Sequence, residues 1–240
     1  MISAAIAMAE SPRTPVLVEL FTSEGCSSCP PADLLLSHLQ QSQPIPGVEV
    51  IALSEHVDYW NQLGWIDPFS SAGLTERQRQ YASVLHGDGV YTPQMVVDGK
   101  TGFVGSDSQK ALRAIAEAAK APRTGIELRC GADPATLAVR IDNGPEADAD
   151  VTLAIAENGL QSNVTRGENR GRLMAHAGVA RSITLIGRGK KRQPFSAEPK
   201  LAIDRGWRRE NLSAVVFLQD RASHRILGSG RIALSACAVN

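Results

Sequence analysis

The stretch FTSEGCSSCPPADLLL, from Phe21 to Leu36, decides how the rest of the chain is interpreted. It places Cys26 and Cys29 between an apolar run that predicts a strand and a run that predicts a helix. Pro30 and Pro31 suit a first helical turn, where their missing N–H groups would have no partner. A Cys-x-x-Cys pair at this position has three interpretations: half of a metal site, a structural disulfide, or a redox centre.

The redox interpretation has a physical basis. Unpaired N–H groups and the positive end of the helix dipole stabilise a thiolate at a helix N-terminus. The thiolate is the species that attacks in thiol–disulfide exchange. Cys26 is therefore the candidate nucleophile, and Cys29 is the thiol that would resolve a mixed disulfide.

The metal interpretation needs further ligands. A tetrahedral zinc site would require a second Cys-x-x-Cys or a suitably spaced histidine pair, and the five histidines do not supply one. A copper site needs less, because two thiolates and one distant histidine are enough. His56 or His86 could be that third ligand to Cys26 and Cys29.

Composition restricts the class of protein. The chain has 240 residues, 43% of them apolar, and 25 basic residues balance 25 acidic ones. This balance gives no basic field for nucleic acid, and no apolar run approaches the ~18 residues of a membrane helix. The composition indicates a globular protein, and it does not indicate an oligomeric state.

The N-terminal residues and the two remaining cysteines bear on the cellular compartment. Residues 1–13 are rich in small apolar side chains and resemble the end of a secretory signal, or else form a disordered N-terminus. If the protein is exported to the periplasm or secreted, Cys130 and Cys237 are expected to form a structural disulfide. The alternative is that both are buried free thiols.

The pattern of elements changes near residue 122. Residues 14–122 alternate between strand-like and helix-like runs in the order β-α-β-α-β-β-α, which predicts an α/β domain with a mixed sheet flanked by helices. One of these helices is expected over Thr75–Leu85, with Thr75 as its N-cap. Residues 123–240 contain short strand-like runs separated by turns, which predict a C-terminal antiparallel β-sandwich-like domain.

A second motif, VYTPQMVVDGK, covers Val90–Lys100. Pro93 stands directly before an expected strand that an Asp-Gly turn folds into a hairpin. If the Thr92–Pro93 peptide bond is cis, the backbone of Thr92 can face the cysteine pair.

Together, PVLVELFTSEGCSSCPPAD and VYTPQMVVDGK resemble the thioredoxin superfamily over Thr14–Ala121. The chain also resembles a bacterial secreted family of unknown function with a thioredoxin-like domain. That second resemblance rests on the segments LFTSEGCSSCPPAD, EHVDYWNQLGWIDPFSSAGLTERQRQYA, YTPQMVVDG and GENRGRLMAHAGVARSI.

The thioredoxin resemblance implies roles for individual residues. Cys26 and Cys29 match the active-site pair, and Thr92 and Pro93 match the substrate-positioning residue and the cis-proline. Glu19 is the candidate proton-transfer acid, although it stands one residue further from the first cysteine than the thioredoxin acid. An aromatic residue and a Gly-Pro dipeptide in thioredoxin are replaced here by Gly25 and by Ser27–Ser28, which leaves the redox potential open.

Two further segments are candidates for binding. The long aromatic loop Glu55–Ser71 could place His56, Asp58 and Trp60 along a groove beside Cys26, or its aromatic residues could form a small local core. The segment Asn163–Ser182 carries four arginines. It could hold an acidic partner, although such runs are more often solvated surfaces.

These observations favour a thiol–disulfide oxidoreductase acting outside the cytosol on protein or small-molecule thiols. It would need a thiol or disulfide substrate and a redox recycling partner, and no organic cofactor is implied. Two alternatives remain at this point: a copper-handling protein that uses Cys26, Cys29 and a histidine, and a non-catalytic binding module built on the same scaffold.

Overall fold

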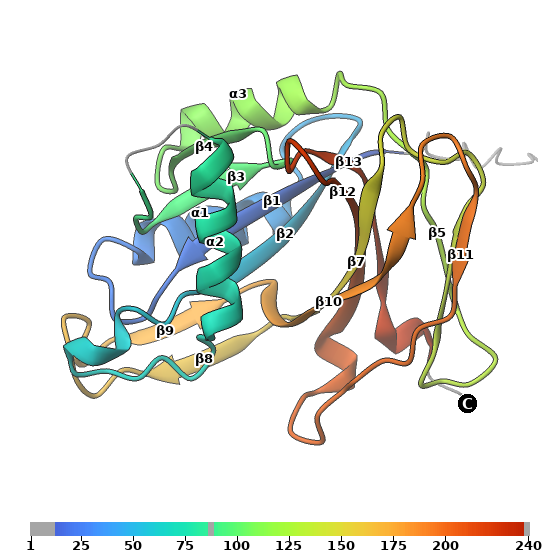
Figure 1. The fold of residues 1–240 in the computed structure, drawn as a ribbon. Coiled ribbons are helices and arrows are strands. Elements are labelled where there is room, and N and C mark those ends of the chain that lie inside the picture. The colour runs from blue at the N-terminus through green and yellow to red at the C-terminus, as the bar shows by residue number, and fades with distance from the viewer. Residues whose placement is uncertain (1–12, 86–88, 238–240) are drawn as a thin grey trace, which may run out of the picture.

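The computed structural model describes residues 13–85 and 89–237. The expected signal segment of residues 1–13 lies outside this part of the chain, apart from Arg13, and so does His86. The described residues form a mixed α/β structure in which one large mixed sheet carries three α-helices and two smaller antiparallel sheets (Figure 1).

The helices and strands follow one another along the whole chain. The helices are α1 (Pro30–Ser42), α2 (Ala72–Val84) and α3 (Ser108–Ala118). The strands of the large sheet are β1 (Thr14–Thr22), β2 (Val48–His56), β3 (Gln94–Val97), β4 (Thr101–Val104), β7 (Ala149–Glu157), β10 (Val179–Gly189), β12 (Leu212–Asp220) and β13 (Ile226–Ala233). The smaller sheets contain β5 (Glu127–Cys130), β6 (Leu137–Ile141) and β11 (Phe195–Ala197), and β8 (Leu160–Asn163) and β9 (Leu173–His176).

The large sheet has the strand order β13-β12-β7-β10-β2-β1-β3-β4. β1 and β2 run parallel because α1 connects them, whereas β3 is antiparallel to both β1 and β4. The predicted elements of the first half are therefore present, in the predicted order.

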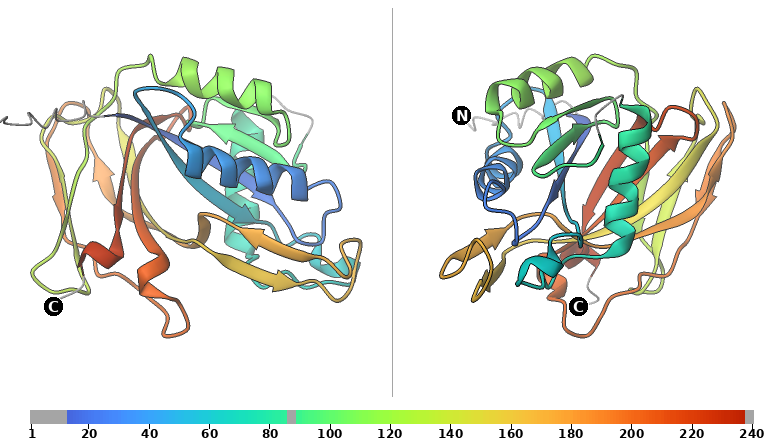
Figure 2. Two further views of the ribbon diagram at one scale, coloured as in Figure 1. Left: turned by 180° about the vertical axis from the view of Figure 1, so that it is seen from behind. Right: turned by 60° about the vertical axis from the view of Figure 1, so that its left-hand side comes forward.

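Helices α1 and α3 cover one face of β1 and β2 (Figure 2). Strand side chains alternate between faces, so the even-numbered residues of β1, such as Val18 and Leu20, pack against Ala32, Leu36 and Ile115 of these helices. This packing fixes the start of α1, and with it the cysteine pair, against the end of β1.

Strands from the second half cover the opposite face. Val215 and Phe217 of β12 pack against Leu17 and Leu53 of the first half. The alternate residues of β12, such as Val216, face the small β5–β6–β11 sheet across a separate core. β7 and β12 are thus buried on both faces, which explains their nearly continuous apolar sequence.

In the second half, the antiparallel β5–β6–β11 sheet thus packs on the large sheet, and the large sheet continues into the first half. The boundary expected between residues 122 and 123 does not divide two separate sheets. The two halves join where Val179 of β10 pairs with Ser54 of β2 and the Ser54 amide donates to the carbonyl of Gly178 at 2.7 Å. Gly178 has a φ of +63°, and a Cβ there would lie 2.5 Å from the carbonyl oxygen of Ala52, so this junction requires glycine.

Helix α2 corrects one sequence-based expectation. The helix begins at Ala72, and Ser71 is its N-cap, with Oγ accepting from the Leu74 amide. The predicted cap, Thr75, is instead buried inside the helix, where its hydroxyl donates to the carboxylate of Asp58 at 2.5 Å. Ser71 satisfies the same rule as Thr75, and the sequence pattern alone did not separate them.

Within the described part of the chain, none of the helices has the length and apolarity needed to cross a membrane.

Candidate functional site

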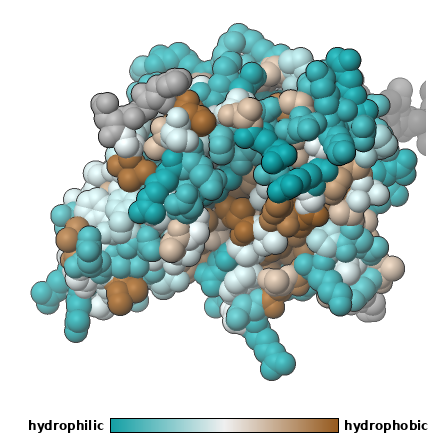
Figure 3. Space-filling model, viewed as in Figure 1, coloured by the Kyte–Doolittle hydropathy of each residue, from teal (hydrophilic) through white to brown (hydrophobic). Residues whose placement is uncertain are grey.

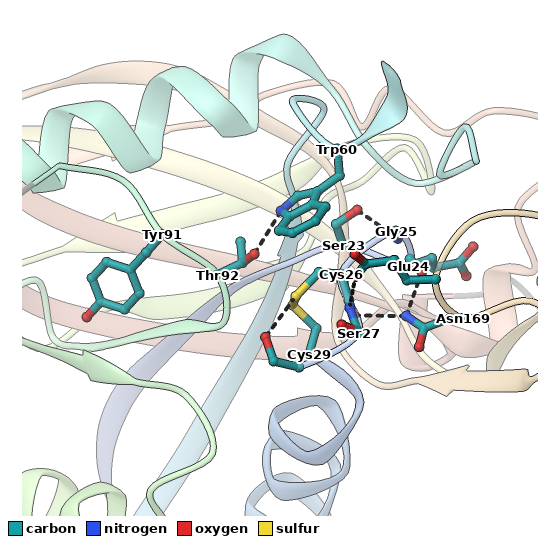
Figure 4. Close-up of a disulfide and its surroundings, with 12 residues drawn as sticks. Ser23, Glu24, Gly25, Cys26, Ser27, Cys29, Trp60, Tyr91, Thr92 and Asn169 are labelled. Atoms are coloured by element: carbon teal, nitrogen blue, oxygen red, sulfur yellow. Dashed lines mark hydrogen bonds between the residues drawn. A yellow bond between two sulfur atoms is a disulfide. The ribbon is translucent and has the colours of Figure 1, made fainter. Parts of the chain in front are cut away.

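The two cysteines of the Cys-x-x-Cys motif form a disulfide at the start of α1, with their Cα atoms 5.4 Å apart (Figure 4). Cys29 is the N-cap of α1, and Cys26 lies in the turn before it, where its amide donates to the carbonyl of Ser23. Pro30 and Pro31 occupy the first helical turn as expected. Both cysteines are 0% exposed, so the disulfide lies below the surface.

The Thr92–Pro93 peptide bond is cis, and Thr92 lies in the surroundings of the cysteine pair (Figure 4). Pro93 is buried, and its carbonyl accepts from the amide of Gly105 at 2.9 Å. A Cβ on Gly105 would lie 3.2 Å from Cβ of Pro93 and 3.1 Å from Cβ of Ala32. The cis-proline and the first turn of α1 therefore lie on either side of Gly105.

Trp60 connects the loop before α1 to the cis-proline loop. Its indole Nε1 donates to the hydroxyl of Thr92 at 2.8 Å, and its Cβ lies against Gly25 (Figure 4). Trp60 therefore lies against Gly25, the residue that precedes Cys26. The ring is half-buried and also packs on a cluster formed by Phe21, Val57, Tyr81 and Val96, so part of the aromatic loop does form a local core.

The second half of the chain supplies a direct contact to the cysteine loop. Asn169 is 0% exposed, and its side-chain amide donates to the carbonyls of Glu24 and Cys26 at 2.9 and 2.8 Å. The neighbouring Glu168 carboxylate accepts from the amide of Ser27 at 3.1 Å. We call the connection between β8 and β9, residues 164–172, the β8–β9 loop.

Behind the cysteine loop lies a buried polar network around Glu24. Its carboxylate accepts hydrogen bonds from Trp65 Nε1 at 2.8 Å and from the hydroxyl of Ser162, and it pairs with His176 Nε2 at 3.0 Å. The Glu24 amide donates to Asp67 at 2.8 Å. Nothing in the sequence connected residues 24, 162 and 176, because they are far apart along the chain.

His56 belongs to the same network and does not line an open groove. Its Nδ1 bonds Asp67 Oδ2 at 2.7 Å, and its ring centroid lies 4.7 Å from that of His176. Burial alone would raise the pKa of Asp67, but the His56 ring and the hydrogen bonds to this carboxylate hold it below the ordinary value.

Asp58 points elsewhere. Its backbone amide and its carboxylate both bond Thr75 on α2. Of the three groove candidates, only Trp60 therefore contacts the loops that carry the cysteines and the cis-proline; His56 is a buried network residue, and Asp58 anchors the start of the aromatic loop to α2.

Asp33 is the buried acid on α1, one turn after Cys29. Its side chain is almost fully buried, and neither carboxylate oxygen has a hydrogen-bond partner among the described residues. Burial raises the pKa of Asp33 to about 7, and the nearby His176 ring and Thr22 hydroxyl oppose this only in part. The sequence alone does not single out Asp33, because an acid in the first turn of a helix is common.

Glu19 lies on the other face of the sheet from α1. Its carboxylate bonds Arg77 at 2.5 Å and accepts from the Tyr81 hydroxyl at 2.6 Å, both on α2. Because side chains alternate along β1, an odd-numbered residue cannot share the face on which Leu20 packs against α1. The one-residue difference in spacing therefore moves the acid away from the side of the sheet that α1 covers.

Glu19 and Glu55 share a single arginine. Arg77 Nε lies 3.4 Å from Glu55 Oε1 and 2.7 Å from Glu19 Oε1. Burial and the neighbouring Glu19 carboxylate raise the pKa of Glu55 well above its ordinary value. These residues form a charged core between α2 and the sheet.

The other two cysteines are joined as well. Cys130 of β5 and Cys237, at the end of the chain's last described turn, form a disulfide with Cα atoms 5.2 Å apart. Cys237 is buried against the core under the β5–β6–β11 sheet. This is the structural pairing expected from the sequence.

The copper alternative required Cys26, Cys29 and His56 to come together. Among the described residues, no group of three or more His, Cys, Asp or Glu side chains is arranged to hold a metal ion. The His56 ring is instead paired with Asp67.

A separate cavity of about 530 Å³ opens between α2 and β10. Its lining includes Phe69, Leu74, Arg181, Leu185 and Trp207, and neither cysteine borders it. Figure 3 shows apolar residues gathered in a hollow on this side of the molecule. The cavity is therefore distinct from the cysteine site.

The fold and site define a mixed α/β protein with a buried Cys-x-x-Cys disulfide next to a cis-proline. Residues 17–219 match the family model described as a protein of unknown function (DUF1223). The chain belongs to that family.

Solved structures resemble the whole chain. Protein AGR_C_4864 from Agrobacterium tumefaciens is 27% identical, with a TM-score of 0.77 over 97% of this chain and 99% of that one. HBP35 of Porphyromonas gingivalis is 17% identical, with a TM-score of 0.65 over 95% of this chain and 77% of that one. The second likeness concerns the fold alone. Among curated proteins, none matches the chain.

Proposed function

We propose that this protein is a thiol–disulfide oxidoreductase with a thioredoxin-like core, in which Cys26 is the nucleophile and Cys29 the resolving thiol. The observation that carries the proposal is the placement of a Cys-x-x-Cys disulfide at the start of α1, with the loop of the cis Thr92–Pro93 bond near it (Figure 4). A purely structural disulfide requires neither a helix N-terminus nor a cis-proline nearby.

The order of the elements supports the thioredoxin-like assignment. β1, α1, β2, α2, β3, β4 and α3 follow one another, and their four strands lie in the order β2-β1-β3-β4. β1 and β2 are parallel, and β3 is antiparallel to β1. This is the arrangement that the resemblance of residues 14–121 implies.

The proposed reaction proceeds from the reduced protein. The Cys26 thiolate attacks one sulfur of a substrate disulfide, a mixed disulfide forms, and the first substrate thiolate leaves and takes up a proton. The Cys29 thiolate then attacks Cys26 Sγ, which releases the second substrate thiolate and restores the Cys26–Cys29 disulfide. Two electrons pass from the protein to the substrate, and a dithiol reductant must return them.

Asp33 is the residue we assign to proton transfer at Cys29. It lies one helical turn after Cys29, where side chains four residues apart are neighbours. A carboxyl group with a pKa of about 7 can accept a proton near neutral pH, as a general base must. Glu19, which is bound to Arg77 on the other face, does not have this position.

The two disulfides favour an oxidising compartment. We therefore propose that the protein works in the periplasm or is secreted. Its substrate and its recycling partner would be found there.

Trapping of the mixed disulfide tests the proposal. Reduced Cys29→Ser is expected to form a stable adduct with a disulfide-bonded peptide through Cys26, whereas the matched variant Cys26→Ser is expected to form none. The Cys26 alkylation midpoint in Cys29→Ser should lie below the ~8.5 of a free thiol. Absence of an adduct, together with a midpoint at or above the free value, would show that the pair is a structural disulfide.

A further inference from the structure

The β8–β9 loop brings a group of positive charges to the cysteine site. Asn169 and Glu168 bind the backbone on both sides of Cys26, through the carbonyls of Glu24 and Cys26 and the amide of Ser27. The hairpin that carries them reaches beneath the start of α1 (Figures 1 and 2). Arginines 166, 170 and 172 are within three residues of these anchors.

Among the described residues, the three arginines have no acidic partner. All three are exposed, and within the described residues none of them forms an ion pair with a carboxylate, although many other arginines of the chain do, among them Arg77, Arg123 and Arg231. The one acid of the loop, Glu168, directs its carboxylate to the Ser27 amide. The loop therefore presents unneutralised positive charge beside Cys26.

The positive charge of the β8–β9 loop is a local feature, because the chain as a whole is neutral. The chain as a whole carries 25 basic and 25 acidic residues and has a formal net charge of +0, so no general positive field would attract nucleic acid or an anionic membrane. Guanidinium groups bind carboxylates with two parallel hydrogen bonds. The chemistry that fits the loop is a short run of Asp or Glu residues on a polypeptide.

We propose that Arg166, Arg170 and Arg172 form a docking surface for an acidic segment of a polypeptide substrate. In the substrate, this segment lies next to the disulfide that exchanges with Cys26. This inference rests on the proposed oxidoreductase function and names its substrate class. Docking on the β8–β9 loop also has a steric consequence. The disulfide is fully buried, and Asn169 of the same loop holds the cysteine loop in place, so displacement of this loop by the substrate gives access to Cys26.

The test uses single-turnover oxidation of the full chain. The protein is reduced with dithiothreitol, freed of reductant, and mixed with three synthetic cyclic disulfide peptides of equal length. These carry Asp and Glu, Asn and Gln, or Lys residues beside the disulfide. Quenching with an alkylating agent and mass spectrometry give the rate of Cys26–Cys29 formation for each peptide at low and high salt.

We expect the wild-type protein to react roughly tenfold faster with the acidic peptide than with the neutral one at low salt. The basic peptide should be slowest, and the difference should largely disappear at about 1 M salt, where the Debye length is about 3 Å. The triple variant Arg166→Gln/Arg170→Gln/Arg172→Gln should have an acidic-to-neutral rate ratio close to one. The matched triple variant Arg129→Gln/Arg140→Gln/Arg192→Gln removes three exposed arginines elsewhere and should keep the wild-type ratio.

The outcomes separate this inference from the proposed function. Equal wild-type rates with the acidic and neutral peptides, or a preference that survives in the β8–β9 loop variant, would overturn the docking surface and leave the oxidoreductase intact. No reaction with any of the peptides would overturn both. Circular dichroism and thermal unfolding of each variant establish that the rates refer to folded protein.

Discussion

The side-chain amide of Asn169 lies 2.8 Å from the carbonyl oxygen of Cys26, to which it donates a hydrogen bond across 143 residues of sequence. The same amide donates to Glu24 at 2.9 Å. One buried side chain of the second half therefore holds the backbone of the loop that carries Cys26 in the first half. The position of the Cys26–Cys29 disulfide thus depends on both halves of the chain.

Removal of Asn169 should destabilise the oxidised protein and loosen the cysteine loop. Asn169→Ala removes the side-chain donor shared by the carbonyls of Glu24 and Cys26, and the Cys26 carbonyl keeps only the amide of Cys29 at 3.2 Å. The loss should cost about 1–3 kcal/mol in the free energy of unfolding. Urea unfolding measures this loss, and the rate of Cys26 alkylation in reduced protein, which should rise, measures the loosening. Asn143→Ala, at an exposed position, is the control; a similar change in both variants would contradict the anchoring role.

Asp33 should make stability depend on pH. Its folded pKa, about 7, lies above the ordinary value of 3.8, so the neutral form is favoured in the folded state. Neutral Asp33 contributes fully to the free energy of unfolding below about pH 4. That contribution is lost as the pH rises to about 7, where the unfolded state is already ionised, and the loss is about 4 kcal/mol in all. Asp33→Asn keeps the neutral form at every pH.

The variant should therefore unfold at the same urea concentration as the wild type at pH 4, and at a clearly higher one at pH 8. Asp142→Asn changes an exposed carboxylate and should leave the difference between pH 4 and pH 8 as in the wild type. Parallel pH profiles for Asp33→Asn and the wild type would mean that Asp33 is ionised at no cost in the folded protein.

Much of the first half could be predicted from its sequence because its signals are local. The Cys-x-x-Cys pair, the prolines after it and the alternating runs indicated the start of α1, and the resemblance pointed to the cis bond at Thr92–Pro93. Ser71 replaced Thr75 as the cap of α2 because both residues satisfy the same local rule.

The network around Glu24 could not be predicted in this way, because it depends on contacts between distant segments. His176 of β9 and Ser162 of β8 contact Glu24 because these two strands lie beneath α1. The alternation of apolar residues predicts each strand, but it does not show which strand of the second half pairs with β2. The joining of the two halves in one sheet was missed for the same reason.

Arg77 should be essential to the charged core under α2. It is the cation that contacts both Glu19 and Glu55, so Arg77→Met leaves two buried carboxyl groups without a counter-charge. Breaking a buried ion pair from one side costs about 3–5 kcal/mol. Arg79→Met removes an exposed arginine of the same helix, where the loss should be within about 1 kcal/mol. Thermal unfolding at pH 7 compares the two, and equal midpoints would refute the role of Arg77.

Gly178 should be intolerant of a side chain. Gly178→Ala adds a Cβ that would lie 2.5 Å from the Ala52 carbonyl oxygen, and it also places alanine at a positive φ. We expect a loss of about 2 kcal/mol or more in the free energy of unfolding. Gly125→Ala meets nothing within 4 Å and is the matched control. If Gly178→Ala were as stable as Gly125→Ala, the junction of β10 with β2 would be looser than the structure has it.

The Cys130–Cys237 disulfide should support the fold without taking part in exchange. It closes a loop with a sequence separation of 107, and removing such a bridge costs about 2–5 kcal/mol. Cys130→Ser/Cys237→Ser should therefore unfold at a lower temperature. The pH midpoint of Cys26 alkylation should stay at the wild-type value, because the bridge joins β5 to the core under the β5–β6–β11 sheet and that core contains no residue of the cysteine loop. A shift of that midpoint in the folded variant would show that the two disulfides are coupled.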